Sequence, residues 1–231
     1  MRGWKTTRWL GAILISIAAC GDGTGPATSR NNPGTGTSTL QVSADIDAND
    51  DAAAVGGFVT VYDVSVRNGL GDPVSAATVT ISNPSLGTLT LPETAPASGD
   101  YLITGNGFPS GDFTLSVVRG TDNVRDVVLG GPGVQNISAP LATSTAMAGQ
   151  PLPVRWSVPS RAQAAEVETR DFGPITLPDT GAYNVPGASN PVRADQRVRV
   201  FRYNEVSMAG GLPGSRLRVK VRKTAEPVNV Q

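Results

Sequence analysis

Short runs of alternating apolar and polar residues dominate the chain from Leu40 onward. The first run is LQVSADID, and similar runs recur with Gly, Pro, Asn or Asp in the gaps between them. Successive side chains of a β-strand point to opposite faces, so a period of two predicts strands that are buried on one face only. The gaps predict turns. We therefore expect an all-β protein.

The runs fall into two sets. The first set predicts a β-sandwich over residues 40–139, and the second set predicts another over 140–223, followed by a C-terminal tail at 224–231. In the run LPVRWSV, Trp156 shares one face with Leu152, Val154 and Val158. A lone Trp among alternating apolar residues is more often buried than exposed as a sugar platform, so we expect Trp156 in the core.

Two segments of the first set resemble a known domain. They are VRNGLGDPVSAATVTISN and GDYLITGNGFPSGDFTLSVVRG, and together they resemble the carboxypeptidase regulatory-like domain over about residues 58–120. The matching positions are Gly99, Tyr101, Pro109, Gly111, Phe113, Leu115 and Val117. The resemblance implies an Ig-like (transthyretin-like) β-sandwich without catalytic residues. In the second set, DTGAYNV resembles the tyrosine corner of Ig-like domains, which implies that the Tyr183 hydroxyl bonds to nearby backbone.

The first 19 residues predict a secretory signal peptide. The segment MRGWKTTR carries three basic residues and no acid, and WLGAILISIAA at 9–19 is apolar or small throughout. Eleven residues rise about 16 Å as a helix, roughly half of the hydrocarbon core of a bilayer, so a spanning helix is not expected. A charged start, a short apolar run and small residues at its end are typical of a cleaved signal.

Cys20 is the only cysteine, and it ends the sequence Ile17-Ala18-Ala19-Cys20. This segment resembles the lipobox of bacterial lipoproteins, which implies cleavage before Cys20 and acylation of its thiol and its new amine. Two or three acyl chains give stable membrane attachment, whereas one is marginal. The resemblance implies a lipid-anchored protein of the bacterial envelope and, because Gly21 and not Asp follows the cysteine, the outer membrane in a Gram-negative cell. The alternative is an ordinary secretory signal followed by a free cysteine.

The segment after Cys20 lacks the residues needed for a core. Between residues 21 and 39, 14 of 19 positions are Gly, Ser, Thr or Pro, and no apolar residue is larger than Ala. Such a segment cannot bury enough surface to fold alone. We therefore predict that residues 20–39 form an acylated, flexible linker.

Charge is distributed unevenly along the chain. Residues 43–130 hold eleven acidic residues and three basic ones, whereas residues 193–223 hold nine basic residues and two acidic ones. Opposite charges attract at low ionic strength, so the two domains could dock with each other or with a neighbouring copy.

The basic segment also offers a candidate anion-binding face. In QRVRVFRYN and SRLRVKVRK, cations alternate with apolar residues and would project from one side of paired strands. They are Arg197, Arg199, Arg216, Arg218, Lys220 and Arg222. Arginine suits phosphate and carboxylate groups, so an anionic glycan or an envelope protein is a candidate partner. The competing interpretation is a solubilising outer face with charged edges that prevent aggregation.

One acidic cluster is a weak candidate metal site. Asp45, Asp47 and Asn49 have the alternate spacing of an EF-hand loop, but Asp50 and Gly56 stand where that loop needs Gly and Glu. We expect a solvated acidic strand end and no metal.

The chain contains no histidine, which excludes a Ser-His-Asp site, a Cys-His site and a His-ligated zinc. No phosphate-binding loop is present, and the mature chain after residue 19 would keep only 16 of the 19 basic residues against 19 acidic ones, so no specific nucleic-acid binding is expected. We predict a non-enzymatic binding or spacer unit without a cofactor. The alternatives are an adhesin-like or anionic-glycan-binding protein, or an accessory subunit of an envelope enzyme.

Overall fold

The computed structural model describes residues 31–160 and 162–231, which are built from strands with two short 3-10 turns. Cys20 and the predicted signal lie outside these residues. The first half holds β1 (Thr35–Gly36), β2 (Gln41–Asp50), η1 (Val55–Gly57), β3 (Phe58–Arg67), β4 (Thr78–Asn83), β5 (Gly87–Leu91), β6 (Asp100–Asn106), β7 (Asp112–Arg119) and β8 (Asp122–Gly130). The second half holds β9 (Ile137–Ala139), β10 (Thr145–Ala146), β11 (Leu152–Trp156), β12 (Ala164–Thr169), β13 (Ile175–Leu177), β14 (Ala182–Val185), η2 (Gly187–Ser189), β15 (Arg193–Ser207) and β16 (Arg216–Val230).

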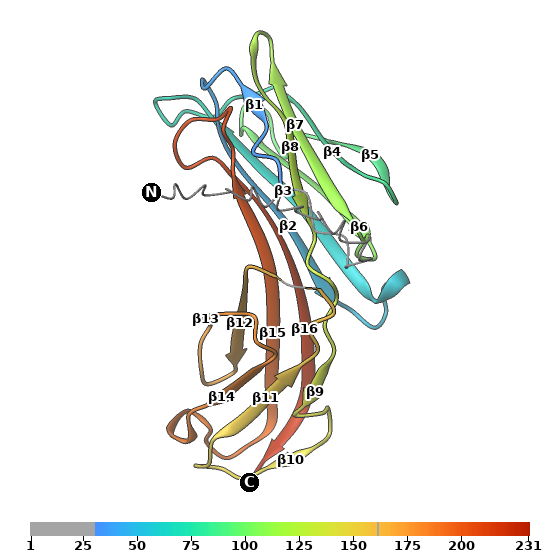
Figure 1. Cartoon of the computed structure of the whole chain (residues 1–231), viewed down its shortest axis with the longest axis vertical. Coiled ribbons are helices and arrows are strands. Elements are labelled where there is room, and N and C mark those ends of the chain that lie inside the picture. The colour runs from blue at the N-terminus through green and yellow to red at the C-terminus, as the bar shows by residue number, and fades with distance from the viewer. Residues whose placement is uncertain (1–30, 161) are drawn as a thin grey trace, which may run out of the picture.

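The strands form three sheets, and the largest runs the length of the molecule (Figure 1). Its order is β13-β12-β15-β16-β2-β3-β6, with β10 beside the far end of β16. A five-stranded sheet, β1-β8-β7-β4-β5, packs on one end of it, and a three-stranded sheet, β14-β11-β9, packs on the other. The predicted all-β, β-sandwich fold is confirmed.

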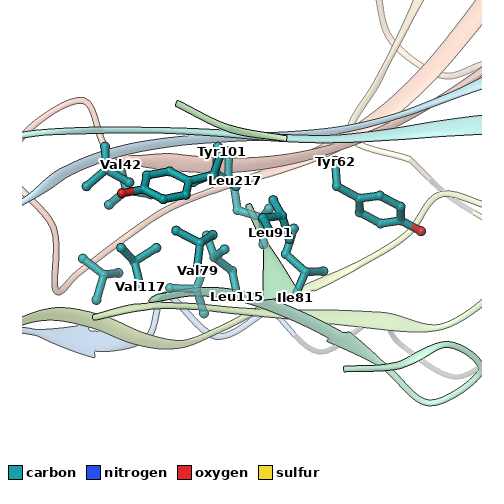
Figure 2. Close-up of a cluster of buried hydrophobic side chains, with 14 of the residues drawn as sticks. Val42, Tyr62, Val79, Ile81, Leu91, Tyr101, Leu115, Val117 and Leu217 are labelled. Atoms are coloured by element: carbon teal, nitrogen blue, oxygen red, sulfur yellow. The ribbon is translucent and has the colours of Figure 1, made fainter. Parts of the chain in front are cut away.

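The first core lies between the five-stranded sheet and the β16-β2-β3-β6 part of the large sheet. Figure 2 shows Val79, Ile81 and Leu115 of the five-stranded sheet facing Val42 and other side chains of the large sheet. Fully burying a side chain of this kind contributes about 1.5–3 kcal/mol. The second core contains Val154, Trp156, Val167 and Val200 among others, so the prediction that Trp156 is a core residue is confirmed.

One long hairpin serves both cores. Strands β15 and β16 have 15 residues each, which corresponds to a length of about 50 Å. Leu217 and Val219 belong to the first core, whereas Val198 and Val200 belong to the second. The division of the chain into two domains at residues 139/140 stays a prediction. In the structure the C-terminal hairpin contributes residues to both cores.

The C-terminal end of the chain is strand, which corrects the predicted tail at 224–231. Strand β16 continues to Val230, and Val228 and Val230 are buried. Pro227 interrupts the sequence pattern because proline cannot donate a ladder hydrogen bond. The strand continues past it where β15 shifts register opposite Ala225 and Val228. Irregularities of this kind accommodate proline within sheets.

Residues 31–39 correct the predicted linker at its C-terminal end. Strand β1 pairs with β8, and the Ser38 N–H donates to the Gly210 carbonyl at 2.9 Å. A Cβ on Gly36 would lie 2.5 Å from the Gly210 oxygen, so only glycine permits this approach. The glycine that suggested flexibility here allows two backbones to pack closely.

Within the described residues, the Tyr183 hydroxyl makes no backbone hydrogen bond of the kind expected for a tyrosine corner. Tyr183 stacks on Phe172 with ring centroids 6.0 Å apart. The tyrosine that ties a hydroxyl to backbone is Tyr101, which donates to the Val74 carbonyl at 2.9 Å and accepts from the Ala77 N–H at 2.8 Å. It lies in the first core (Figure 2).

A buried ion pair holds the second sandwich to the connection between the cores. The side chains of Arg202 on β15 and Asp179 are 0% and 1% exposed. Asp179 also accepts from Trp156 Nε1 at 3.0 Å, and Arg202 donates to the carbonyls of Gly133 and Ser160. Burial alone would raise the pKa of Asp179, but hydrogen bonds from Arg202, Trp156 and Ala162 and the charge of Arg202 hold it below its usual value.

We predict that Arg202→Met lowers the free energy of unfolding by about 3–5 kcal/mol, because it leaves the Asp179 carboxylate buried without its cation. Arg222→Met, which removes a half-buried partner at the surface, should cost about 1 kcal/mol or less. Urea unfolding followed by tryptophan fluorescence measures both. Equal losses of unfolding free energy for the two variants would contradict the conclusion that the Arg202–Asp179 pair is buried and the Arg222 pair is not. The double change Arg202→Met with Asp179→Leu should recover part of the loss.

Candidate functional site

The candidate site is the outer surface of the large sheet, where charged side chains form a continuous band. Leu217, Val219 and Val221 of β16 point into the cores, so the residues between them point outward. We call this surface the charged face, and its members are Asp45, Asp47, Asp50, Glu166, Glu168, Arg197, Arg199, Phe201, Tyr203, Glu205, Arg216, Arg218, Lys220 and Arg222. All six predicted anion-binding cations therefore lie on one surface.

Asp45 of β2 holds two of these cations. Its carboxylate accepts from both terminal nitrogens of Arg216, at 2.9 and 2.8 Å, and from Arg218 Nε at 2.9 Å. Burial would raise the pKa of Asp45, but the hydrogen bonds and charges of Arg216 and Arg218 hold it below its usual value. Burial would lower the pKa of Arg218, but Asp45 raises it above its ordinary value.

Asp50 of β2 links β2 to β16 where the backbone pairing of these two strands ends. Backbone pairing of β2 with β16 stops at Ala48 and Val221. The Asp50 carboxylate then accepts from the Thr224 N–H at 2.8 Å, the Thr224 hydroxyl at 2.9 Å and Arg222 Nε at 3.3 Å. A side chain thereby satisfies a backbone donor that a continuing strand would have satisfied.

The remaining cations pair with β12. Lys220 Nζ lies 2.8 Å from Glu166, and Arg199 lies 2.9 Å from Glu168. Arg197 reaches the same Glu168 carboxylate at 3.7 Å only. Burial, followed by repulsion from Arg199 and Arg170, lowers the pKa of Arg197.

Two aromatic rings lie among the cations. Lys220 Nζ lies 4.4 Å from the Phe201 ring centroid, and the Arg218 guanidinium carbon lies 5.7 Å from that of Tyr203. Cation–π contacts of this kind contribute about 0.5–1 kcal/mol at exposed sites. They restrict the long side chains to positions above the sheet.

The charge asymmetry of the sequence is therefore realised inside one sheet. Acids of β2, from the acidic half, pair with cations of β16, from the basic half. Each of the six candidate cations has a carboxylate of this chain within 3.7 Å. Anion binding stays a prediction, and an incoming anion would compete with those carboxylates.

The weak metal candidates lie in a row on β2. Asp45, Asp47 and Asn49 face outward, and the Asp45 oxygens are bonded to arginines. Burial and the neighbouring Asp45 charge raise the pKa of Asp47. In the described parts of the chain, no group of three His, Cys, Asp or Glu residues could hold a metal ion.

Sequence reasoning missed the Arg202–Asp179 pair and the partners of the six cations. A signal for the first was present. In DQRVRVFRYN, Arg202 has the same parity as Val198 and Val200, which are buried, whereas Arg197 and Arg199 have the opposite parity. A charged residue in a buried row requires a partner.

No family model matches the chain, and no curated protein matches it. Solved structures that it resembles include the Yersinia pseudotuberculosis adhesin InvE (16% identity, 82% of this chain and 60% of that chain, TM-score 0.27). They also include fibronectin(III)-like modules of Clostridium thermocellum CbhA (14% identity, 83% and 94%, TM-score 0.28) and DIP-gamma IG1+IG2 (9% identity, 84% and 98%, TM-score 0.26). Likeness of this degree indicates neither a shared function nor a shared binding site.

The described residues thus define an all-β protein with two sandwich cores on one continuous sheet. Within residues 31–160 and 162–231, no helix is long and apolar enough to cross a membrane.

We predict opposite effects for two neighbouring acids of β2. Asp45→Asn should lower the free energy of unfolding at pH 7 by about 1–2 kcal/mol, since it removes charged hydrogen bonds to two arginines. Asp47→Asn should raise it by about 1 kcal/mol or less, since it removes a desolvated charge beside Asp45. Thermal unfolding of the two variants and the wild type from pH 3 to pH 7 measures both effects.

The pH dependence follows from the pKa directions. The folded pKa of Asp45 is below its unfolded value, so its contribution is complete above about pH 4 and is lost as the pH falls through the folded pKa. The pKa of Asp47 is raised, so the cost of its charge disappears as the pH falls through that value. Both differences from wild type should therefore shrink toward pH 3. A destabilised Asp47→Asn variant at pH 7 would contradict this account.

Proposed function

We propose that the protein is a lipid-anchored lipoprotein of the bacterial envelope. Its attachment would be through acyl chains on Cys20, and its role non-enzymatic: a stiff spacer that presents a binding end away from the membrane. The lipobox resemblance at Ile17-Ala18-Ala19-Cys20 supports the anchor. In a Gram-negative cell the outer membrane would hold it, because Gly21 follows the cysteine.

The observation that carries the spacer role is the β15–β16 hairpin. The two strands pair along their length and contribute residues to both cores. The two cores are therefore joined by a paired hairpin as well as by the connecting chain. Residues 32–36 run along β8 of the first sandwich, from Asn32 opposite Val128 to Gly36 opposite Val124, and the C-terminus lies at the far end of the second sandwich (Figure 1). An anchor before residue 31 would thus attach the protein through its first sandwich, and the second sandwich would extend away from that attachment.

A non-enzymatic role is supported by the use of the acids on the charged face. Glu166 and Glu168 could in principle form a carboxylate pair for glycoside hydrolysis. Each is bonded to a cation of the same sheet, Lys220 and Arg199 respectively. The two carboxylates therefore act as ion-pair partners that link neighbouring strands of the sheet.

The anchor is tested at the N-terminus of the mature protein. Mass spectrometry of material from bacterial membranes should find Cys20 as the first residue with two or three acyl chains attached, because that number gives stable attachment. The native protein should partition into detergent, and a Cys20→Ser variant should partition into water. A mature protein that begins at Met1, or that enters water with Cys20 intact, would refute the anchor.

The spacer is tested by a distance between the two ends. Leu70 and Val192 are 88% and 75% exposed, and they lie in the first and second halves of the chain. Spin labels at Leu70→Cys and Val192→Cys, in a Cys20→Ser background, should give one narrow distance distribution. That distribution should not change between low and high salt, because backbone pairing joins the cores. A broad or salt-dependent distribution would indicate a hinge and exclude a stiff spacer.

A further inference from the structure

An apolar pocket lies in the second sandwich at the end opposite β1. Its volume is about 450 Å³, and strands β9, β10 and the start of β11 surround it. These strands lie beside the C-terminus at the lower end of Figure 1. Ligand-binding pockets commonly have volumes of about 300–1,000 Å³. We call it the tip pocket, and its apolar lining includes Pro140, Leu141, Met147, Pro151, Leu152 and Pro153.

The rim of the tip pocket exposes apolar side chains to solvent. Met147 is 71% exposed and Leu141 is 59% exposed, although both line the pocket. A contiguous exposed apolar patch commonly marks an interaction site. Burying these two side chains under a partner would remove apolar surface from water, which is favourable.

The lining determines the charge of an occupant. It consists of apolar residues with Ser138, Ser144, Thr145 and Gln150, and it contains no Asp, Glu, Lys or Arg. A charged group brought into such a pocket would lose its water without gaining a partner of opposite charge. The occupant that fits this pocket is therefore uncharged.

An open strand edge lies at the same pocket. Strand β10 pairs in parallel with β16, and the carbonyls of Ser144 and Ala146 accept from the N–H groups of Asn229 and Gln231 at 2.8 and 3.0 Å. Because backbone groups alternate in direction along a strand, the N–H and C=O of Thr145 point away from β16. The next carbonyl on that edge, of Met147, accepts from Asn190 Nδ2 at 3.0 Å, so the open carbonyl of β10 is that of Thr145. Strand β9, on the other side of the pocket, is the outer strand of the three-stranded sheet.

We propose that the tip pocket binds an extended, uncharged peptide segment of a partner protein. The segment pairs with the N–H and C=O of Thr145 at the open edge of β10 and inserts an apolar side chain between Leu141 and Met147. Strand addition of this kind takes affinity from main-chain hydrogen bonds and specificity from side-chain pockets. The added strand would extend the large sheet beyond β10, and it would be held by the same kind of main-chain hydrogen bonds that join β10 to β16. This inference rests on the proposed role of the protein as a spacer with a binding end. It names the class of partner that the end of the second sandwich would bind.

The test uses the full chain with Cys20→Ser, purified without detergent, so that detergent cannot fill the pocket. The probe is a fluorescent peptide of alternating Thr and Val, and binding is measured by anisotropy. Leu141→Asp and Met147→Asp should each weaken binding at least tenfold, because they place a charge at the apolar rim. Leu70→Asp alters a comparably exposed leucine outside the tip pocket, and it should bind as the parent does.

A second measurement separates strand addition from side-chain binding alone. The same peptide with N-methylated amides keeps its side chains but cannot pair with a strand edge, and it should bind at least tenfold more weakly. Equal binding of the methylated peptide, equal binding by the three Asp variants, or no saturation by the peptide would each overturn the inference. Binding of uncharged Nile red without binding of the peptide would make the occupant a small molecule and also overturn it. Failure of the anchor would appear separately, in the mass of the mature N-terminus.

Discussion

The parallel pairing of β2 with β16 is the interaction on which the architecture depends. Six residue pairs, from Arg216 with Ser43 to Val221 with Ala48, join strands from opposite ends of the chain. The entropy cost of closing so long a loop grows only slowly with its length. Burial of Leu217 and Val219 in the first core offsets that cost. Since β16 continues into the second core, this seam also fixes the two sandwiches relative to each other.

The charged face brings residues of the acidic and basic segments of the chain together, and its six carboxylates balance its six cations. Asp45 and Asp50 stand opposite cations of β16, so the acidic and basic segments neutralise each other. Exposed ion pairs contribute little stability each. Cations recur at every second residue of β16 from Arg216 to Arg222, so a slip of two residues would keep every apolar residue inward and still leave Asp45 beside a cation. The contact that depends on the observed register is that of Asp50, whose carboxylate accepts from the Thr224 N–H and the Thr224 hydroxyl.

Local features of the fold could be predicted from the sequence, and long-range ones could not. The period of two located strands and the buried face of Trp156, because both depend on neighbouring residues. The partner of β16 could not be found this way, since nothing local relates Arg216 to Asp45. The sequence pattern predicts neither the strand after Pro227 nor the pairing of β1, because proline and glycine commonly interrupt strands. In the structure, a register shift accommodates the first, and close backbone contact requires the second.

The two surfaces differ in what a partner would have to displace. At the charged face, an anion approaching Arg216 or Arg218 must compete with Asp45, which already holds both within 3 Å. Each charge removed from water there needs full compensation. At the tip pocket the lining holds no charged residue that a partner would compete with, and each 100 Å² of apolar surface covered would contribute roughly 2.5 kcal/mol before the cost of ordering the partner. The charged face would therefore oppose an anionic partner more than the tip pocket, whose lining contains no charged residue, would oppose an uncharged one.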